Sequence, residues 1–455
     1  MKLRRKFATV ATIAALASVV PVSSAIAGTS LGGGGATFLA NMMDICAAQY
    51  NRNQTYNPNT DTVTYASVGS SSGKTNFANG TYKFGGSESA YSSGAPASLV
   101  YIPLVGGPIA IGYRVDGATP ATAQVRLTGE LVAKIFAGQI TNWNDPAIAA
   151  VNKATTVAKK LSVTNAGVTA SVKKVGTKVN FTVTMTSAAR TKFAKAKVVI
   201  TRTALGGSPK ILLSAAPKAT LTRSIAYAKN TFYTVKAGKT TIGTLAVEQV
   251  KDGETITFPN LAIRVAYRSG GSGTTNNFAN YLNKSFPSIW TKATNDNFTT
   301  AFPGTVPSDG SFQSASGNEG VSNYVRDNNG AITYAEISFL EERKVKAAAI
   351  QNPGKKFVAP SPVSSAIWFE AADVSPEGLV TQNYTNTAAD AYPINAISYG
   401  LASKTPSADN TAVKSFFSYF IDVCAPKNAA AVGYTALQGA ILAKADAQVA
   451  KIGAG

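Results

Sequence analysis

IRVAYRSGGSGTTNNFANYLN, residues 263–283, decides the fold class because one glycine-rich turn joins two different patterns. The first six residues are typical of a β-strand, and TTNNFANYLN is typical of a helix. A strand, a tight Ser/Gly turn and a helix in this order indicate an α/β protein.

Two earlier turns have the same character. GGGGATF (32–38) precedes the helical run FLANMMDICAAQY, and VGSSSGK (68–74) follows the strand TVTYASV. Each turn places main-chain N–H groups and hydroxyls at a helix N-terminus, where the helix dipole favours an anion. One such loop is more often a turn or a cap than a site. Three loops, one of them led by Arg268, favour a site for a tetrahedral anion, because a guanidinium can hold two of its oxygens.

VGSSSGKT (68–75) also looks like the phosphate loop of nucleotide-hydrolysing enzymes, G-x-x-x-x-G-K-[ST]. However, only three residues separate Gly69 from Gly73, and Val68 stands where the first glycine is needed. A loop that is one residue short directs its amides differently, so Lys74 would not reach the phosphates. The sequence therefore leaves two readings, a turn before a helix or a loop that holds a free oxyanion.

The N-terminal stretch predicts export. Residues 1–27 contain a basic start, an apolar run and a small-residue cleavage site, as a secretory signal peptide does. No cysteine follows the site, so we expect no lipid anchor on a mature N-terminal cysteine, and the remaining chain has no apolar run long enough to cross a bilayer. We expect a protein of the periplasm, the cell surface or the extracellular space, where little ATP is available.

Histidine and cysteine limit the chemistry. The chain has no histidine, which excludes a Ser-His-Asp triad and a zinc site with imidazole ligands, and we predict no catalytic residue, metal site or cofactor. Cys46 and Cys424 are the two cysteines. An oxidising compartment favours a disulfide between them, which would tie both ends of the chain into one lobe, and two buried free thiols are the alternative.

The positive charge is concentrated in one segment. The formal net charge is +20, and residues 153–258 hold 18 Lys and Arg against three acidic residues. GVTASVKKVGTKVNFTVTM (167–185) alternates apolar and polar residues around a glycine turn, as a β-hairpin does, whereas LTGELVAKIFAGQITNWNDPAIAAVN (127–152) is typical of helices. We predict that 153–258 is an inserted all-β domain, Ig-like sandwiches being one architecture of this size.

Three roles remain open for this basic insert. It could be a solvated surface, it could attach to an anionic polymer of the cell envelope through salt-sensitive attraction, or it could bind extracellular nucleic acid. The last is disfavoured because the segment lacks a dense aromatic surface for stacking bases, so no specific nucleic-acid partner is predicted.

Further segments carry a family resemblance that extends along nearly the whole mature chain outside the insert. FGGSES (84–89) resembles a family element F-G-A-S-D, and LTGELVAKIFAGQITNWNDPAI resembles L-x-x-I-F-x-G-x-I-x-x-W-x-D-P. SGNEGVSNYVRDNNGAITYAEISF (316–339) resembles G-N-D-G-V…G-A-I-G-Y-V-E, and AYPI with FFSYF…GYTAL fits a return to the first lobe. With the three turns, these segments resemble the phosphate-binding proteins of bacterial phosphate ABC transporters, which are two-lobed periplasmic-type binding proteins.

The resemblance implies a type II periplasmic-binding-protein-like α/β fold with a hinge. Residues 29–105 and 394–455 would form lobe I, and residues 106–152 and 259–393 lobe II, with chain crossings near Val105–Gly107 and Pro393–Ile394. The insert would enter at the amino end of the strand AIRVAYR and project away from the cleft.

The resemblance also implies a ligand set. Closing lobes would surround inorganic phosphate with hydroxyl groups, main-chain amides, one guanidinium and one carboxyl group. They would come from Thr37, Phe38, Ser70, Glu88, Arg268, Ser272, Gly273 and Thr274. In this reading Lys74 is a solvated helix residue. The implied protein is a monomeric, non-enzymatic receptor that delivers phosphate to the permease and ATPase subunits of a transporter. A surface or adhesion protein that acts through its basic insert is the alternative; a secreted phosphatase is disfavoured because the chain lacks histidine and metal-ligand clusters.

Two positions depart from the family pattern. Glu88 stands where the family has aspartate, so its carboxylate can face the ion only if the backbone leaves room for one more methylene. That carboxylate matters because phosphate retains a proton that it can donate, whereas sulfate does not. Gly270 stands where an acidic residue often follows the arginine, which removes a partner of Arg268.

Overall fold

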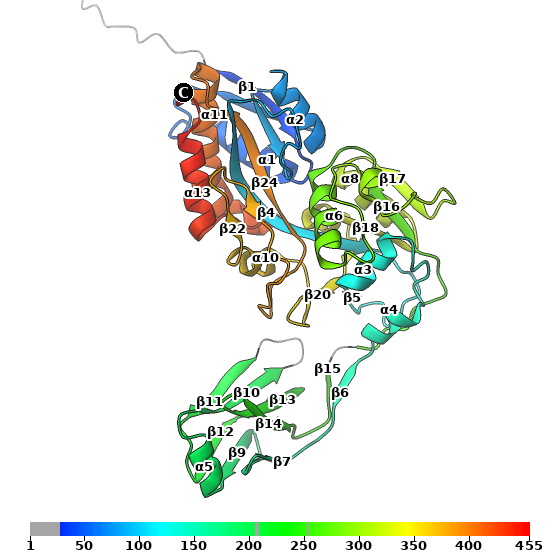
Figure 1. The fold of residues 1–455 in the computed structure, drawn as a ribbon, viewed down its shortest axis with the longest axis vertical. Coiled ribbons are helices and arrows are strands. Elements are labelled where there is room, and N and C mark those ends of the chain that lie inside the picture. The colour runs from blue at the N-terminus through cyan, green and yellow to red at the C-terminus, as the bar shows by residue number, and fades with distance from the viewer. Residues whose placement is uncertain (1–27, 205–208, 253) are drawn as a thin grey trace, which may run out of the picture.

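The computed structural model describes residues 28–204, 209–252 and 254–455. The predicted signal peptide, residues 1–27, lies outside the described residues. Figure 1 shows two α/β lobes side by side and a smaller β module below them, which is connected to the second lobe. Within the described ranges, no helix combines the length and apolar character that a membrane span requires.

One nine-stranded sheet passes through both lobes in the order β17-β16-β18-β4-β24-β3-β1-β2, with β19 also paired to β4. The long strand β4 (Leu99–Tyr113) pairs with β24 (Asn395–Ser403) in its first part and with β18 (Ala331–Glu336) from Ile109 onward. The chain therefore changes lobes inside β4. The returning chain lies beside this point, because the N–H of Ile109 donates to the carbonyl of Ile394 at 2.8 Å. Both connections between the lobes are thus neighbours.

The first lobe contains three parallel strands covered by helices. Gly73 shows why this lobe needs its glycines: a Cβ there would lie 2.5 Å from the Cα of Gly35, so the helix that carries Gly73 could not lie this close to the first strand. The elements are β1 (Ser30–Gly35), α1 (Ala40–Tyr50), β2 (Thr62–Ser67), α2 (Ser70–Ala78), β3 (Phe84–Ser87), α11 (Ala408–Tyr419), η1 (Phe420–Cys424), α12 (Ala425–Asn428), η2 (Ala429–Val432) and α13 (Gly439–Ala450).

The second lobe repeats this arrangement. Its strands β16 (Arg264–Arg268), β17 (Phe312–Ala315) and β18 are parallel to one another, and Phe278 of α6 stacks on Tyr334 with ring centroids 4.4 Å apart. The other elements are β5 (Arg126–Thr128), α3 (Gly129–Phe136), α4 (Pro146–Val151), α6 (Gly273–Ser285), α7 (Phe298–Ala301), α8 (Gly317–Asp327), α9 (Ile337–Glu342), β19 (Lys346–Ala347), β20 (Ala349–Gln351) and β21 (Phe357–Val358).

One segment expected in lobe II lies against the first lobe instead. The helix α10 (Pro362–Phe369) and the hairpin of β22 (Asp373–Val374) and β23 (Val380–Thr381) contact β4 and α13. Gln448 of α13 donates to the carbonyl of Pro376 at 2.6 Å. The apolar side chains of α10 pack on the first part of β4. The segment from α10 to β23 therefore packs with the first lobe, whereas the predicted boundary at residue 393 assigned it to the second.

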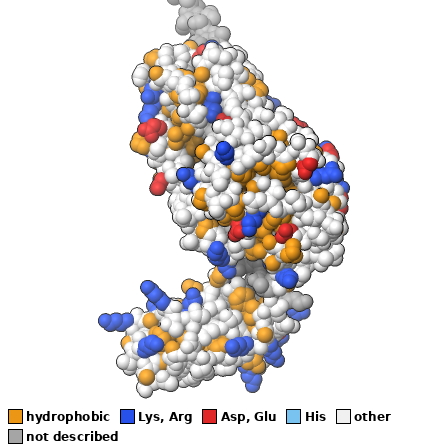
Figure 2. Space-filling view, turned by 45° about the vertical axis from the view of Figure 1, so that its right-hand side comes forward, with side chains coloured by type: hydrophobic (Ala, Val, Ile, Leu, Met, Phe, Trp, Pro, Cys, Tyr) orange, Lys and Arg blue, Asp and Glu red, His pale blue; other side chains and the backbone are white. Residues whose placement is uncertain are grey.

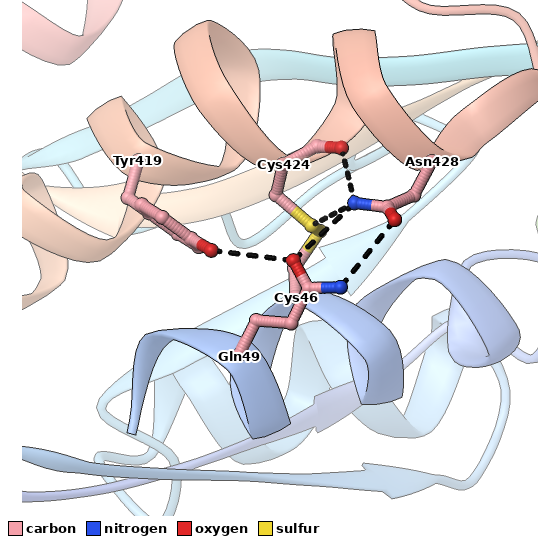
Figure 3. Close-up of a disulfide and its surroundings, with 5 residues drawn as sticks. All are labelled: Cys46, Gln49, Tyr419, Cys424 and Asn428. Carbon is pink, nitrogen blue, oxygen red and sulfur yellow. Dashed lines mark hydrogen bonds between the residues drawn. A yellow bond between two sulfur atoms is a disulfide. The ribbon is translucent and has the colours of Figure 1, made fainter. Parts of the chain in front are cut away.

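The two cysteines form the disulfide that the sequence favoured. Cys46 of α1 is bonded to Cys424, 378 residues later, and both side chains are fully buried (Figure 3). Beside it, the amide of Asn428 donates to the carbonyl of Cys424 at 2.8 Å and to Gln49 at 3.3 Å. The bridge ties the helix after the first turn to the C-terminal part of the chain.

The basic segment forms two four-stranded antiparallel sheets, β12-β9-β8-β7 and β11-β10-β13-β14, around a hydrophobic cluster of its own. It includes one short helix, α5 (Ser187–Lys192), which the all-β expectation did not contain. The paired strands β6 (Thr155–Val157) and β15 (Val250–Asp252) connect it to the second lobe. Its strands are β7 (Ser162–Asn165), β8 (Val168–Val175), β9 (Lys178–Met185), β10 (Val198–Ala204), β11 (Lys210–Ala215), β12 (Thr220–Ala226), β13 (Thr231–Ala237) and β14 (Thr240–Leu245).

Candidate functional site

The three turns meet where parallel strands end. In the first lobe, Gly35 of β1 is in register with Ser67 of β2 and with Gly86 of β3, so the turns that follow all three strands leave the same edge. In the second lobe, Arg268 at the end of β16 is in register with Ala315 at the end of β17. Carboxyl ends of parallel strands are the usual place for ligands in such sheets.

Direct contacts join the two lobes at these edges. The hydroxyl of Ser70, at the first position of α2, accepts a hydrogen bond from the N–H of Gly273, at the first position of α6, at 3.0 Å. The same hydroxyl donates to the carboxylate of Glu88 at 3.1 Å, and Ser398 of β24 donates to the other carboxylate oxygen at 2.9 Å. The longer side chain of Glu88 therefore reaches back into the site and does not turn away from it.

Burial governs the ionisation of Glu88. The side chain is 3% exposed, and loss of water raises the pKa of its carboxyl to about 7, even though hydrogen bonds from Ser398 and Ser70 and the charge of Arg268 act in the opposite direction. Near neutral pH this carboxyl therefore exists both as acid and as carboxylate.

Arg268 and Thr274 hold polar atoms that no protein group satisfies. Arg268 is 4% exposed, and burial lowers its pKa although the charge of Glu88 raises it. Its Nε and Nη1 atoms, and the Oγ1 atom of the fully buried Thr274, are without a hydrogen-bond partner among the described residues. Buried donors that lack a partner are costly and rare in native proteins, so these atoms point to a bound polar group.

The first turn reaches the second lobe through Asn318. Its side-chain amide donates to the hydroxyl of Thr37 at 2.9 Å, and Asn318 lies in the first turn of α8. Gly317, which precedes it, has a φ of +67° and faces Thr37. Phe38 is fully buried, with its ring edge-on to Tyr434 at a centroid distance of 5.9 Å.

The expectation for Lys74 is wrong. Its side chain is only 12% exposed, and its ammonium group pairs with Asp296 of the second lobe at 2.8 Å. The hydroxyl of Ser71 donates to the same carboxylate at 2.9 Å, and Asn276 donates to its other oxygen at 2.9 Å. Lys74 is thus one half of a contact between the lobes, because α2 presents this face to the loop after α6.

All eight predicted ligand residues are buried at the junction of the lobes. Ser70, Glu88 and Gly273 touch one another, Arg268 acts electrostatically on Glu88, and Ser272 caps α6 by accepting from the N–H of Thr275 at 3.2 Å. Sequence reasoning missed Asn318, Ser398 and Asp296. Asn318 lies in the quoted segment SGNEGV, but neither Ser398 nor Asp296 has a local signal, since both arrive from distant parts of the chain. In the part of the chain that the structure describes, no three His, Cys, Asp or Glu side chains gather as a metal site would need.

Comparisons with known proteins agree with this architecture. The chain matches the family described as "PBP superfamily domain" over residues 22–163 and 153–423. It is 25% identical to the phosphate-binding protein PstS of Xylella fastidiosa (strain 9a5c) over 399 residues, which are 86% of this chain and 76% of that protein. It is 31% identical to the phosphate-binding protein PstS of Haemophilus influenzae over 172 residues, 36% of this chain and 47% of that one.

Solved structures share the fold at lower identity. A high-affinity periplasmic phosphate-binding protein (PfluDING), solved with bound phosphate, superimposes with a TM-score of 0.55 and 19% identity over 92% of this chain and 93% of its own. The phosphate-binding protein from Stenotrophomonas maltophilia gives a TM-score of 0.53 and 17% identity over 92% and 93%.

Proposed function

Because the chain belongs to the PBP superfamily, and because its relatives include phosphate-binding proteins, we propose that it binds one inorganic phosphate ion between its lobes. The unpartnered Nε and Nη1 of Arg268 and the Oγ1 of Thr274 are the observation that carries this proposal. A tetrahedral oxyanion would supply acceptors to all three atoms.

The remaining ligands follow from the helix ends. The first turns of α2 and α6 meet at the contact between Ser70 and Gly273, so the positive ends of both dipoles face the same place. Thr37 and the main chain at Phe38 would complete the cage from the first turn. The bound ion would lose its water to groups that are already fixed, which strengthens each charge-assisted hydrogen bond.

Glu88 would discriminate phosphate from sulfate. With a pKa of about 7, its carboxyl can share one proton with a bound phosphate, either as an acceptor from a protonated phosphate or as a donor to the dianion. Sulfate brings no proton, so it would leave a buried carboxylate facing an anion without a hydrogen between them. An unpaired buried polar group costs about 1–3 kcal/mol, but sulfate avoids this cost where Glu88 is protonated. With a pKa of about 7, about half of Glu88 is protonated at pH 7 and about one tenth at pH 8, so the preference for phosphate should be about twofold at pH 7 and about tenfold at pH 8.

Calorimetric titration of the mature protein at pH 8, where Glu88 is mostly ionised, tests this function. We expect saturable one-to-one binding of phosphate and far weaker binding of sulfate. In Glu88→Gln the amide can donate to either ion, so the gap between them should narrow. Failure of the wild type to bind phosphate would refute the function, whereas equal affinity for both ions would refute only the role of Glu88.

We further propose that the exported, monomeric protein delivers phosphate to the permease and ATPase subunits of a membrane ABC transporter. The predicted signal peptide and the family of its relatives support this role. Binding and release by lobe motion around β4 would suffice, without any reaction on the ion.

For the segment 153–258 we propose a separate, sandwich-like domain of Ig-like character that attaches to an anionic polymer of the cell envelope. Its own hydrophobic cluster and its two sheets support an independent unit. Figure 2 shows Lys and Arg side chains spread over the face of this module that is in view, consistent with the 18 basic and three acidic residues of the segment. Such a surface would attract polyanions through a salt-sensitive, sequence-independent term.

The strand pair below the second lobe makes a clean deletion available. Val157 of β6 is the ladder partner of Val250 of β15, so residues 158–249 can be replaced by an Asn-Gly turn. We expect the full chain to be retained on immobilised polyglutamate at low salt and released at high salt, and the shortened chain to pass through while still binding phosphate. Equal retention of both proteins would exclude the module as the attachment site.

A further inference from the structure

Glu336 is a fully buried carboxyl group directly behind the first turn. It ends β18 and caps α9, because the N–H of Ser338 donates to both of its carboxyl oxygens at 3.1 Å. The hydroxyl of Ser338 also hydrogen-bonds to Oε2, and it accepts from the side chain of Asn41 in α1 at 2.8 Å. The group therefore lies where α9 of the second lobe meets α1 of the first.

Two hydrogen-bonded paths connect Glu336 with the proposed phosphate ligands of the first turn. Its main-chain N–H donates to Asn318 at 3.2 Å, and Asn318 donates to the hydroxyl of Thr37 at 2.9 Å. Its carboxyl group interacts with the hydroxyl of Tyr434, and this hydroxyl donates to the carbonyl of Phe38. Both ligand residues of this turn thus depend on the same residue.

Counting hydrogens shows which form of Glu336 fits. A tyrosine hydroxyl has one hydrogen, and a carbonyl can only accept, so Tyr434 gives its hydrogen to Phe38. Towards Glu336, Tyr434 can then only accept. The hydroxyl of Ser338 interacts with both Glu336 and Tyr434. Its one hydrogen is donated to Oε2 of Glu336, so it supplies none to the contact between Glu336 and Tyr434. If Glu336 were a carboxylate, it would bring no hydrogen, and its lone pairs would face those of the Tyr434 hydroxyl. As a neutral acid, Glu336 donates a hydrogen bond to Tyr434.

We propose that Glu336 is a positioning residue for phosphate binding: as a neutral carboxylic acid it holds Tyr434, and through it the main chain of Phe38, in the binding geometry. This inference rests on the proposed function. When Glu336 loses its proton, the carboxylate competes for the single hydrogen of Tyr434 and the carbonyl of Phe38 loses its donor. Phosphate affinity should therefore fall when this group ionises.

The neighbouring ionisable groups identify Glu336 as the one that titrates. Burial raises the pKa of Glu336 to about 8, although the hydrogen bonds from Ser338, and the one that Tyr434 can donate to the ionised carboxylate, oppose this shift. Burial holds the pKa of Tyr434 well above its usual value, so it stays protonated, and the more exposed Glu341 of α9 adds a negative charge that raises the pKa of Glu336 further. On α1, Asn41 is neutral and also contacts Glu342 of α9 at 2.9 Å.

The pH dependence of phosphate affinity tests the inference. With a pKa of about 8, about one tenth of Glu336 remains protonated at pH 9, so the wild type should lose about tenfold in affinity between pH 7 and pH 9 through this group alone. Glu336→Gln keeps a donor towards Tyr434 and an acceptor towards Ser338, so it should lack this tenfold step. Changes in the phosphate ion and in Glu88 are common to both proteins and cancel in the comparison.

Calorimetry at pH 7, 8 and 9 gives decisive outcomes. If Glu336→Gln loses affinity as steeply as the wild type, the inference is wrong. Tyr434→Phe should bind more weakly at every pH and also lack the step; if it keeps the step, the inference fails even where Glu336→Gln does not fold. Should the wild type not bind phosphate at pH 7, the proposed function fails instead. The neutral acid is then still tested without ligand, because the melting temperature of the wild type should fall more between pH 6 and pH 9 than that of Glu336→Gln.

Discussion

The ion pair between Lys74 and Asp296 should hold the lobes closed, and Lys74→Met tests it. The two charged groups lie 2.8 Å apart with both side chains 12% exposed. Removing one partner costs about 3–5 kcal/mol for a buried pair, whereas an exposed pair contributes about 0–1 kcal/mol. Asp296 would keep its hydrogen bonds from Ser71 and Asn276, so we expect a loss of about 2 kcal/mol.

This loss should fall on ligand affinity, because the pair joins residues of different lobes. A cost of about 2 kcal/mol corresponds to about a 30-fold higher Kd for phosphate, seen mainly as faster dissociation. Calorimetry and stopped-flow release at pH 7 measure both quantities. The matched control is Lys83→Met, since Lys83 pairs with Asp409 at the same 2.8 Å but within the first lobe and with 46% and 36% exposure.

Two outcomes would refute this reasoning. A Kd for Lys74→Met within twofold of the wild type would show that the pair does not favour closure, and an equal loss in Lys83→Met would show a general effect of charge. The double variant Lys74→Met/Asp296→Asn should recover part of the affinity, because it removes the unpaired carboxylate that the single variant leaves behind.

Three further predictions concern the site and its support. In Gly273→Ala the new Cβ would lie 2.7 Å from the hydroxyl of Ser70 and from the Cβ of Glu88. We expect phosphate binding to weaken at least a hundredfold while the melting temperature stays near that of the wild type. An affinity within tenfold of the wild type would contradict this prediction. Replacing Cys46 and Cys424 by Ser should lower the free energy of unfolding by about 3–5 kcal/mol in thermal melts while phosphate affinity changes less than threefold; an unchanged melting temperature would show that the bridge adds no stability. The pKa of Glu88 in the folded protein lies near 7, above the usual carboxyl value. The contribution of Glu88 to stability is therefore full at low pH and is lost as the pH rises to about 7. Glu88→Gln should remove about 3 kcal/mol of this decline when unfolding of the ligand-free protein is measured from pH 4.5 to 7.5.

The sequence predicts the parts of this site that depend on local chemistry. Each of the three glycine-rich turns has a recognisable sequence pattern, in which a strand is followed by Ser, Thr or Gly and then by a helix. Parallel strands bring such turns to one edge of a sheet. Arg268 and Ser70 were recognisable for this reason. The disulfide was also predictable, since an exported chain with two cysteines has one pairing available.

The contacts that cross between the lobes could not be predicted, because they depend on how two surfaces meet. Lys74 has the sequence context of an exposed helix residue, and nothing near Asp296 in the chain indicates that it faces α2. Glu336 is similar: its segment carries a family pattern, but its burial and its contact with Tyr434 arise from a C-terminal segment about a hundred residues away. The predicted boundary between the lobes differs from the structure for the same reason, because α10 packs against the apolar surface of β4.

Charge balance links the two departures from the family pattern. Gly270 brings no carboxylate to Arg268, so two of its donor atoms are left for a ligand, and Glu88 is the carboxyl group whose charge acts on this guanidinium. A carboxylate beside a buried anion would be repelled, but burial has already raised the pKa of Glu88 to about 7, so uptake of one proton costs little at neutral pH. The contact between the ligand and Glu88 then needs one proton, and either group can supply it. The site can thus take phosphate on both sides of neutrality, whereas sulfate binds only when Glu88 itself is protonated, so selectivity for phosphate should grow as the pH rises from 6 to 8.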